Sequence, residues 1–204
     1  MRSLILTGMG IRYLQFIPCI ETDPATGKLA DFSVTPEQYG RFLCRIFDRW
    51  YEYGPTKLSI RDFDSVLAYC ISGKHTICTF DKLCADYIVV EHSGDCFPCD
   101  FFVDPEWRLG NILETNIGAL ATCKKKREFS RLKRNLCSKC LVCRHFALCR
   151  GGCMKDRSAH DSSKFDRESY LCEGYKMFFD HAMPKFMQIA ATLKADRSAR
   201  ERPA

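Results

Sequence analysis

The sequence predicts an α+β fold in which a cysteine-rich domain, with a β-hairpin and helices, follows a shorter α/β segment. Three observations support this prediction. The first 70 residues contain the pattern of a well-capped amphipathic helix, and the pattern of a β-hairpin surrounds Gly94. Of the 14 cysteines in 204 residues, all but Cys19 and Cys44 lie at or after Cys70. With 46% hydrophobic and 27% charged residues, the chain has the composition of a globular protein.

Strands and helices are expected to alternate in the first 70 residues. Residues 13–18 predict a short buried strand that ends at Pro18. Thr35, Pro36 and Gln38 predict a helix start, because threonine caps it, proline suits the first turn and glutamine completes a capping box. Up to Gly54, apolar residues recur at helical spacing, namely Tyr39, Phe42, Leu43, Ile46, Phe47 and Trp50. Residues 58–60 predict a second strand and residues 63–69 a second helix, as at the end of an α/β unit.

The composition changes near residue 70, where a second domain is expected to begin. Residues 87–91 and 96–99 predict a β-hairpin, because Gly94 between them can supply the positive φ of the turn. Residues 117–136 predict one basic helix, residues 137–153 an irregular segment, and residues 175–191 a helix that Pro184 should kink or restart. We therefore divide the chain into residues 1–70, a cysteine-rich domain over residues 71–180, and a C-terminal helix and tail over residues 181–204.

The compartment decides how the cysteines are interpreted. Thr7, Gly8, Gly10 and Arg12 interrupt the apolar stretch at the N-terminus, so no export signal is predicted. No run reaches the roughly 18 apolar residues of a membrane-spanning helix, so no membrane association is expected. A cytoplasmic location keeps thiols reduced and available for metals. The basic run over residues 124–134 favours a solvated helix face over a nucleic-acid or acidic-partner patch, and we expect no nucleic-acid partner.

The cysteine spacing is the most informative pattern in the sequence. Four cysteines lie within fourteen residues in the order Cys140-x2-Cys143-x5-Cys149-x3-Cys153, and Gly151 and Gly152 allow the tight folding and amide-to-sulfur hydrogen bonds of an iron–sulfur site. A second group consists of Cys78, Cys84 and Cys99, and Cys172 stands alone. Iron–sulfur clusters and zinc both accept four thiolates, so both remain open, with a disulfide framework as the third alternative. His145 and His160 are possible zinc ligands, although hydrogen-bonded histidines are the simpler interpretation.

These residues also carry a family resemblance. The spacing C-x9-G-x4-C from Cys84, followed by C-x2-C-x5-C-x3-C from Cys140 and by Cys172, resembles the seven-cysteine signature of the SPASM domain of radical S-adenosylmethionine (SAM) maturases. Within that group, four segments are similar to anaerobic sulfatase-maturating enzymes: residues 87–91, 96–103, 108–111 and 151–157. The resemblance extends to residues 14–18 and 50–51, and it implies that residues 1–70 are the end of a partial radical SAM α/β barrel.

The resemblance implies two auxiliary [4Fe–4S] clusters with interleaved ligands. The first would be held by Cys78, Cys84, Cys99 and Cys153, and the second by Cys140, Cys143, Cys149 and Cys172. The implied reaction oxidises a cysteine or serine of a sulfatase peptide to Cα-formylglycine, after a 5′-deoxyadenosyl radical removes a hydrogen from the side-chain β-carbon. Asp100 matches the general base of that family, although without the resemblance it would be interpreted as a structural carboxylate.

One motif of the family is missing from the sequence. The C-x3-C-x2-C loop that binds the radical-generating cluster is absent, because the only x3 pair, Cys149 and Cys153, is followed at the third position by Asp156. SAM and a third [4Fe–4S] cluster are therefore expected only in an intact parent or a complementary radical SAM half, and the chain alone is expected to be inactive. The alternatives are a stand-alone iron–sulfur or zinc module for binding or electron transfer, and an inactive gene fragment.

Overall fold

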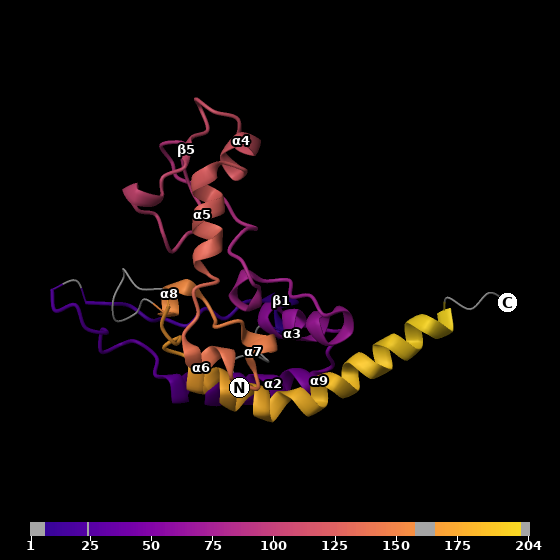
Figure 1. The fold of residues 1–204 in the computed structure, drawn as a ribbon. Helices are drawn as coiled ribbons and strands as arrows, with labels where there is room; N and C mark the ends of the chain where they lie inside the picture. The colour runs from indigo at the N-terminus through magenta and orange to yellow at the C-terminus, as the bar shows by residue number, and fades with distance from the viewer. Residues whose placement is uncertain (1–6, 24, 158–165, 201–204) are drawn as a thin grey trace.

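The computed structural model describes residues 7–23, 25–157 and 166–200. Figure 1 shows a body in which the long helix α9 (Cys172–Arg200) lies along α2 (Pro36–Tyr53) and α3 (Arg61–Ser72). A smaller unit projects from this body and contains β5 (Gly110–Asn111), α4 (Ile117–Ala121) and α5 (Lys124–Leu132). The mixture of helices and small sheets in a cysteine-rich chain agrees with the α+β prediction.

Helix α2 forms as predicted from its capping residues. The Thr35 side chain accepts a hydrogen bond from the backbone N–H of Gln38, and the Gln38 side chain accepts one from the backbone N–H of Thr35. Gly54 ends the helix with a φ of 114°, in the region that favours glycine. The predicted apolar face is buried at Tyr39, Leu43, Phe47 and Trp50, whereas Phe42 is 37% exposed.

Strands β1 (Tyr13–Leu14) and β2 (Ser59–Ile60) pair in parallel, on either side of α2 in the sequence. Both are short, and β1 covers only the first two of the six residues predicted as a strand. Helix α3 follows β2 directly, so the strand–helix–strand–helix order of this segment is confirmed.

Aromatic side chains form the core between α2, α3 and α9. The ring of Phe47 lies 4.7 Å from that of Phe186 and 5.5 Å from that of Phe63, measured between ring centroids. Trp50 donates from Nε1 to the carbonyl of Leu58 over 2.7 Å, which satisfies the only polar atom of this buried ring. Burial of these rings supplies the hydrophobic stabilisation that joins the N-terminal and C-terminal segments.

The projecting unit contains the predicted hairpin and a third strand that was not predicted. Strands β3 (Val89–Val90) and β4 (Asp95–Phe97) pair antiparallel around Gly94, whose φ is 86°. β5 pairs antiparallel with β4 after the 3₁₀ helix η2 (Pro105–Trp107). The prediction of one helix over residues 117–136 is wrong. The Cys123 side chain accepts a hydrogen bond from the Lys126 N–H and starts α5 separately from α4.

The remaining elements are short and surround the cysteines. They are η1 (Cys78–Phe80), α6 (Ser138–Leu141), α7 (Phe146–Cys149) and α8 (Met154–Arg157). The expected restart of the last helix at Pro184 is wrong, because α9 continues through it with buried Phe179 and Phe186 on either side. Packing against α2 and α3 offsets the lost hydrogen bond, and Figure 1 shows α9 as a curved helix. None of the helices in the described ranges is long and apolar enough to cross a membrane.

Candidate iron–sulfur centres

Four of the eight predicted ligand cysteines line a single cavity of about 330 Å³ where the body meets the projecting unit. They are Cys78, Cys84, Cys99 and Cys153. Cys78 begins η1, Cys99 follows β4 and Cys153 precedes α8, so segments that are distant in sequence converge here. The structure therefore brings together the four residues that the resemblance groups as the first ligand set.

The thiols of this first set lie in surroundings that make an isolated charge costly. Burial raises the pKa of Cys99 and the pKa of Cys153, each to about 12. A hydrogen bond with Cys84 lowers the pKa of Cys78 to about 7, with a further contribution from the charge of Lys133. Thiolates in this cavity therefore require a positive partner, which a metal centre supplies.

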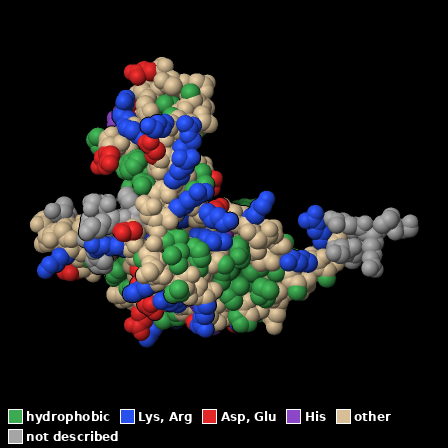
Figure 2. Space-filling view, in the orientation of Figure 1, with side chains coloured by type: hydrophobic (Ala, Val, Ile, Leu, Met, Phe, Trp, Pro, Cys, Tyr) green, Lys and Arg blue, Asp and Glu red, His purple; other side chains and the backbone are tan. Residues whose placement is uncertain are grey.

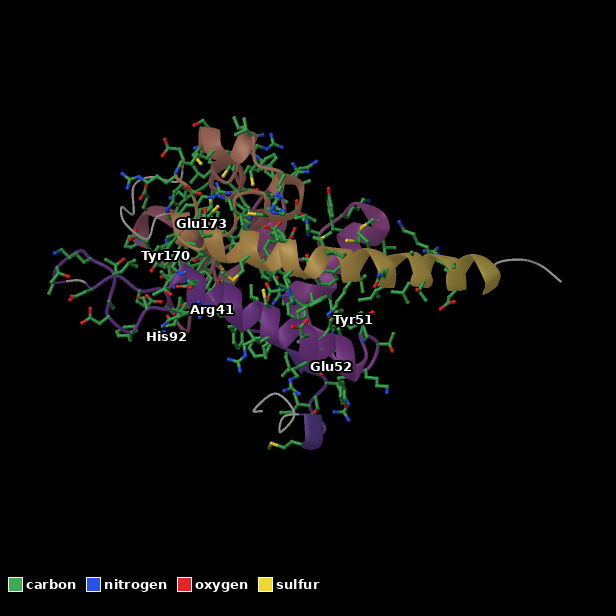
Figure 3. All side chains as sticks on the ribbon, turned by 90° about the horizontal axis from the view of Figure 1, so that it is seen from below. Arg41, Tyr51, Glu52, His92, Tyr170 and Glu173 are labelled. Atoms are coloured by element: carbon green, nitrogen blue, oxygen red, sulfur yellow. The ribbon has the colours of Figure 1, made fainter. Side chains whose placement is uncertain are left out.

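The other four predicted ligands line a second, smaller cavity of about 30 Å³. They are Cys140, Cys143, Cys149 and Cys172. Three of them come from α6, the turn after it and the end of α7, and Cys172 is the first residue of α9. Seen from below, several sulfur atoms lie near the first turns of α9, close to the labelled Glu173 (Figure 3). The carboxylates of Glu168 and Glu173 also come within 4.8 Å of the Cys172 thiol.

The turn after α7 presents backbone amides to a sulfur atom. Arg150, Gly151 and Gly152 have φ values of 48°, 80° and 69°, three consecutive left-handed residues. The backbone N–H of Gly152 donates to the carbonyl of Cys149 over 2.8 Å. The amides of Gly151 and Gly152 also oppose the rise in the pKa of the Cys149 thiol that burial causes. Successive amides in this conformation form the kind of anion-binding nest found at iron–sulfur sites.

Asp100 lies at the first cavity, as part of its lining. Its side chain is exposed, and its Oδ1 lies 3.3 Å from the Cys99 Sγ, which donates a hydrogen bond to it. The side chains of Tyr39 and Tyr175 are buried and line the same cavity. The carboxylate therefore borders both a predicted ligand cysteine and the first cavity.

Buried cations exceed buried carboxylates around the two cysteine sets. Lys126, Lys133 and Arg157 are between 1% and 3% exposed, whereas among the residues that the structure describes Asp156 is the carboxylate buried to a similar degree and Asp62 is partly buried. An uncompensated buried charge costs several kcal/mol, so this excess fits a negatively charged group nearby. Four thiolates bound to a [4Fe–4S] core or to zinc are negative, whereas a pair of disulfides is neutral. The composition of the interior therefore favours a metal centre over a disulfide framework.

Sequence reasoning did not identify Lys126 and Lys133 as buried. It placed the run over residues 124–134 on a solvated face, and Figure 2 does show Lys and Arg side chains exposed over α5. Lys126 and Lys133 depart from that pattern because they occupy the face that carries buried Phe129 and Ser130. The helical spacing relative to Phe129 is the signal that could have identified them.

Four of the six cysteines outside the two sets fall into structural positions. Cys96 is fully buried in β4, Cys123 caps α5, and Cys44 and Cys70 pack against the core. Cys19 is exposed. The sixth is Cys137, whose Sγ lies 3.5 Å from that of Cys140. Cys137 therefore lies beside a predicted ligand of the second set.

Two histidines were considered as possible zinc ligands, His145 and His160. His145 Nε2 lies 2.8 Å from Asp180 Oδ1, as expected for a hydrogen-bonded histidine. His160 lies outside the described residues.

Comparison with known proteins agrees with this geometry. The model of SPASM, an iron–sulfur cluster-binding domain, matches residues 76–144. The cysteine-type anaerobic sulfatase-maturating enzyme of Clostridium perfringens is 35% identical over 185 residues, which are 90% of this chain and 50% of that protein. The serine-type enzyme of Bacteroides thetaiotaomicron is 35% identical over 187 residues, with 84% and 45% covered.

A solved structure shows the same similarity in three dimensions. The structure of native anSMEcpe with bound AdoMet and Cp18Cys peptide superimposes with a TM-score of 0.81 at 32% identity, over 94% of this chain and 53% of that one. The chain thus spans about half the length of the curated relatives it matches.

Proposed function

The chain contains a SPASM iron–sulfur domain and matches the C-terminal half of anaerobic sulfatase-maturating enzymes, and from this premise we propose that it is the auxiliary-cluster portion of such a radical SAM maturase. The complete enzyme would convert a cysteine or serine of a sulfatase peptide to Cα-formylglycine in the cytoplasm. The observation that carries the proposal is the separation of eight cysteines into two cavities, in the interleaved order of the family.

Each cavity would hold one [4Fe–4S] cluster. Cys78, Cys84, Cys99 and Cys153 would ligate the first, and Cys140, Cys143, Cys149 and Cys172 the second. Support comes from the four thiols in the lining of each cavity, from the nest at Cys149 and from the excess of buried cations. When bound, the clusters supply one-electron acceptors whose potentials depend on burial and on hydrogen bonds to sulfur. Because Cys153 joins the first set, the ligands would tie both parts of the cysteine-rich segment together.

Asp100 would act as the general base of the complete enzyme. Its exposed carboxylate borders the first cavity and accepts a hydrogen bond from Cys99, so one oxygen is oriented by the protein while the other can face a substrate. The carboxylate would accept a proton from the substrate side chain beside the cavity. The choice between cysteine and serine substrates would then depend on the rest of the enzyme.

The radical chemistry would come from a complementary radical SAM half. In this proposal residues 1–70 are the end of the partial barrel, residues 71–180 the SPASM domain and residues 181–204 a C-terminal extension. Support comes from β1 and β2, because a parallel pair of strands is normally part of a larger covered sheet. The exposed Tyr13 and Ile17, at 83% and 60%, lie at β1 and just after it, where further strands would pack.

The test is the iron, sulfide and zinc content of the chain purified without oxygen, together with its visible absorption spectrum. About eight irons and eight sulfides per chain are expected for two cubane clusters. The Cys19→Ser variant is the matched control, because Cys19 is exposed and outside both sets. Stoichiometric zinc without sulfide would instead identify a structural module and would refute the redox role.

A further inference from the structure

Lys126 of α5 and Lys133, the residue that caps the C-terminal end of this helix, are buried beneath the first ligand set. Lys126 is 3% exposed and Lys133 is 1% exposed, although both belong to a basic segment whose other cations are exposed. They share one helical face with Ser130, at spacings of four and three residues. Lysine is almost never fully buried unless it is paired, so this face requires an explanation.

Both ammonium groups donate to the peptide carbonyls that adjoin the ligand cysteines. Lys126 Nζ donates to the carbonyls of Cys84 over 3.3 Å, of Pro98 over 3.1 Å, and of Tyr87. Lys133 Nζ donates to the carbonyls of Thr79 over 3.0 Å and of Cys78.

The same helix binds the ligand loops through its backbone as well. The backbone N–H of Cys84 donates to the carbonyl of Ser130 over 3.4 Å. Since Pro98 immediately precedes Cys99, α5 and its cap residue Lys133 bind the peptide groups next to Cys78, Cys84 and Cys99, the three predicted ligands that precede this helix in the sequence.

Hydrogen bonds to carbonyls satisfy the donors but do not neutralise the charges. Among the described residues Asp156 is buried and Asp62 is partly buried, and neither carboxylate forms an ion pair with Lys126 or Lys133. A [4Fe–4S] cluster with four thiolate ligands carries a net negative charge that increases when it is reduced. Two cations held next to the ligand loops therefore interact more favourably with the reduced cluster than with the oxidised one.

We propose that Lys126 and Lys133 are positioning residues of the first cluster, which fix its three loop ligands and stabilise its reduced state. This inference rests on the proposed function, because it requires a cluster in the first cavity. Its consequence is a reduction potential for the first cluster that α5 sets independently of the second cluster.

The variants Lys126→Gln and Lys133→Gln test the role of charge, because glutamine can still donate to the carbonyls. Lys125→Gln is the matched control, since Lys125 is an exposed neighbour on the same helix. Iron and sulfide are counted in each anaerobically purified chain, and both clusters are titrated with EPR detection of the reduced state. We expect each glutamine variant to keep eight irons and the midpoint potential of the second cluster. The midpoint potential of the first cluster should fall, so that at a fixed solution potential the ratio of reduced to oxidised first cluster decreases at least about tenfold.

Each outcome decides between the possibilities. If the glutamine variants keep eight irons and both midpoint potentials equal those of the Lys125→Gln control, this inference is overturned and the proposed function is not. A wild-type chain without iron and sulfide would overturn the proposed function and this inference with it. Loss of about half the iron with intact helix content would support the inference, because assembly then requires the charges.

If a glutamine variant does not fold, Lys126→Arg or Lys133→Arg distinguishes a requirement for positive charge from a packing role. Iron restored by arginine supports a requirement for charge. Failure of arginine as well would leave only a packing role and overturn the inference.

Discussion

Replacing Gly40 by alanine tests whether the crossing of α2 and α9 holds the body together. A Cβ atom at position 40 would lie 2.9 Å from both the Cα and the carbonyl oxygen of Gly174, and 3.1 Å from the sulfur of Met177. Two glycines thus face each other where the helices cross. Gly174 belongs to the first turn of α9, two residues after the ligand Cys172.

The expected cost follows from these distances. Nonbonded carbon atoms rest about 3.5–4.0 Å apart, so the helices must separate by roughly 0.6–1 Å. Forcing an extra methyl group into a packed interface costs about 1–3 kcal/mol. The higher helix propensity of alanine relative to glycine offsets up to about 1 kcal/mol of this cost. We therefore expect Gly40→Ala to lower the free energy of unfolding by about 1–2 kcal/mol.

The assay is anaerobic urea unfolding of the cluster-loaded chain, followed by helical circular dichroism. Gly8→Ala is the control, because a Cβ atom there meets no atom within 4 Å and needs no unusual backbone. The control is expected to be as stable as the wild type or slightly more stable. A Gly40→Ala chain as stable as the Gly8→Ala chain would refute the reasoning, because the helices could then separate without loss.

Three further predictions concern the candidate site. Cys153→Ala should lower the iron content from about eight to about four per chain and destabilise the fold, and unchanged iron would refute the interleaved assignment. Asp100→Asn, placed in a full-length parent, should keep both auxiliary clusters and lose turnover; retained activity would return Asp100 to a structural role. Burial raises the pKa of Asp62 to about 6, above its ordinary 3.8, so its ionisation opposes folding as the pH rises from about 4 to 6. Asp62→Asn should then remove a loss of up to about 3 kcal/mol in unfolding free energy between pH 4 and pH 7, and parallel stability curves for the two chains would contradict this.

Local sequence patterns predicted the elements whose causes are local. The capping box at Thr35 and the apolar stripe of α2 fix that helix without help from other segments. Gly94 likewise identifies the hairpin, because its positive φ is a requirement of the turn. The grouping of cysteines that the structure brings into each cavity was implied by the family resemblance, whereas spacing alone placed Cys153 beside Cys140, Cys143 and Cys149.

Features that depend on tertiary contacts could not be predicted in this way. The short strand β5 is defined by its pairing with β4, since the two residues Gly110 and Asn111 have no strand pattern of their own. The split between α4 and α5 depends on the Cys123 cap, which a basic and helix-favouring sequence conceals. Continuation of α9 through Pro184 depends on packing against two other helices, which outweighs a local penalty.

The position of Cys172 links the hydrophobic core to the second candidate cluster. Cys172 begins the helix whose later turns bury Phe178, Phe179 and Phe186 against α2 and α3. Any ligand that binds only the folded arrangement of Cys172 with the loop cysteines stabilises that arrangement by mass action. Cluster binding should therefore raise the stability of the α2–α9 crossing, and loosening of the crossing by Gly40→Ala should in turn speed the loss of iron to a chelator.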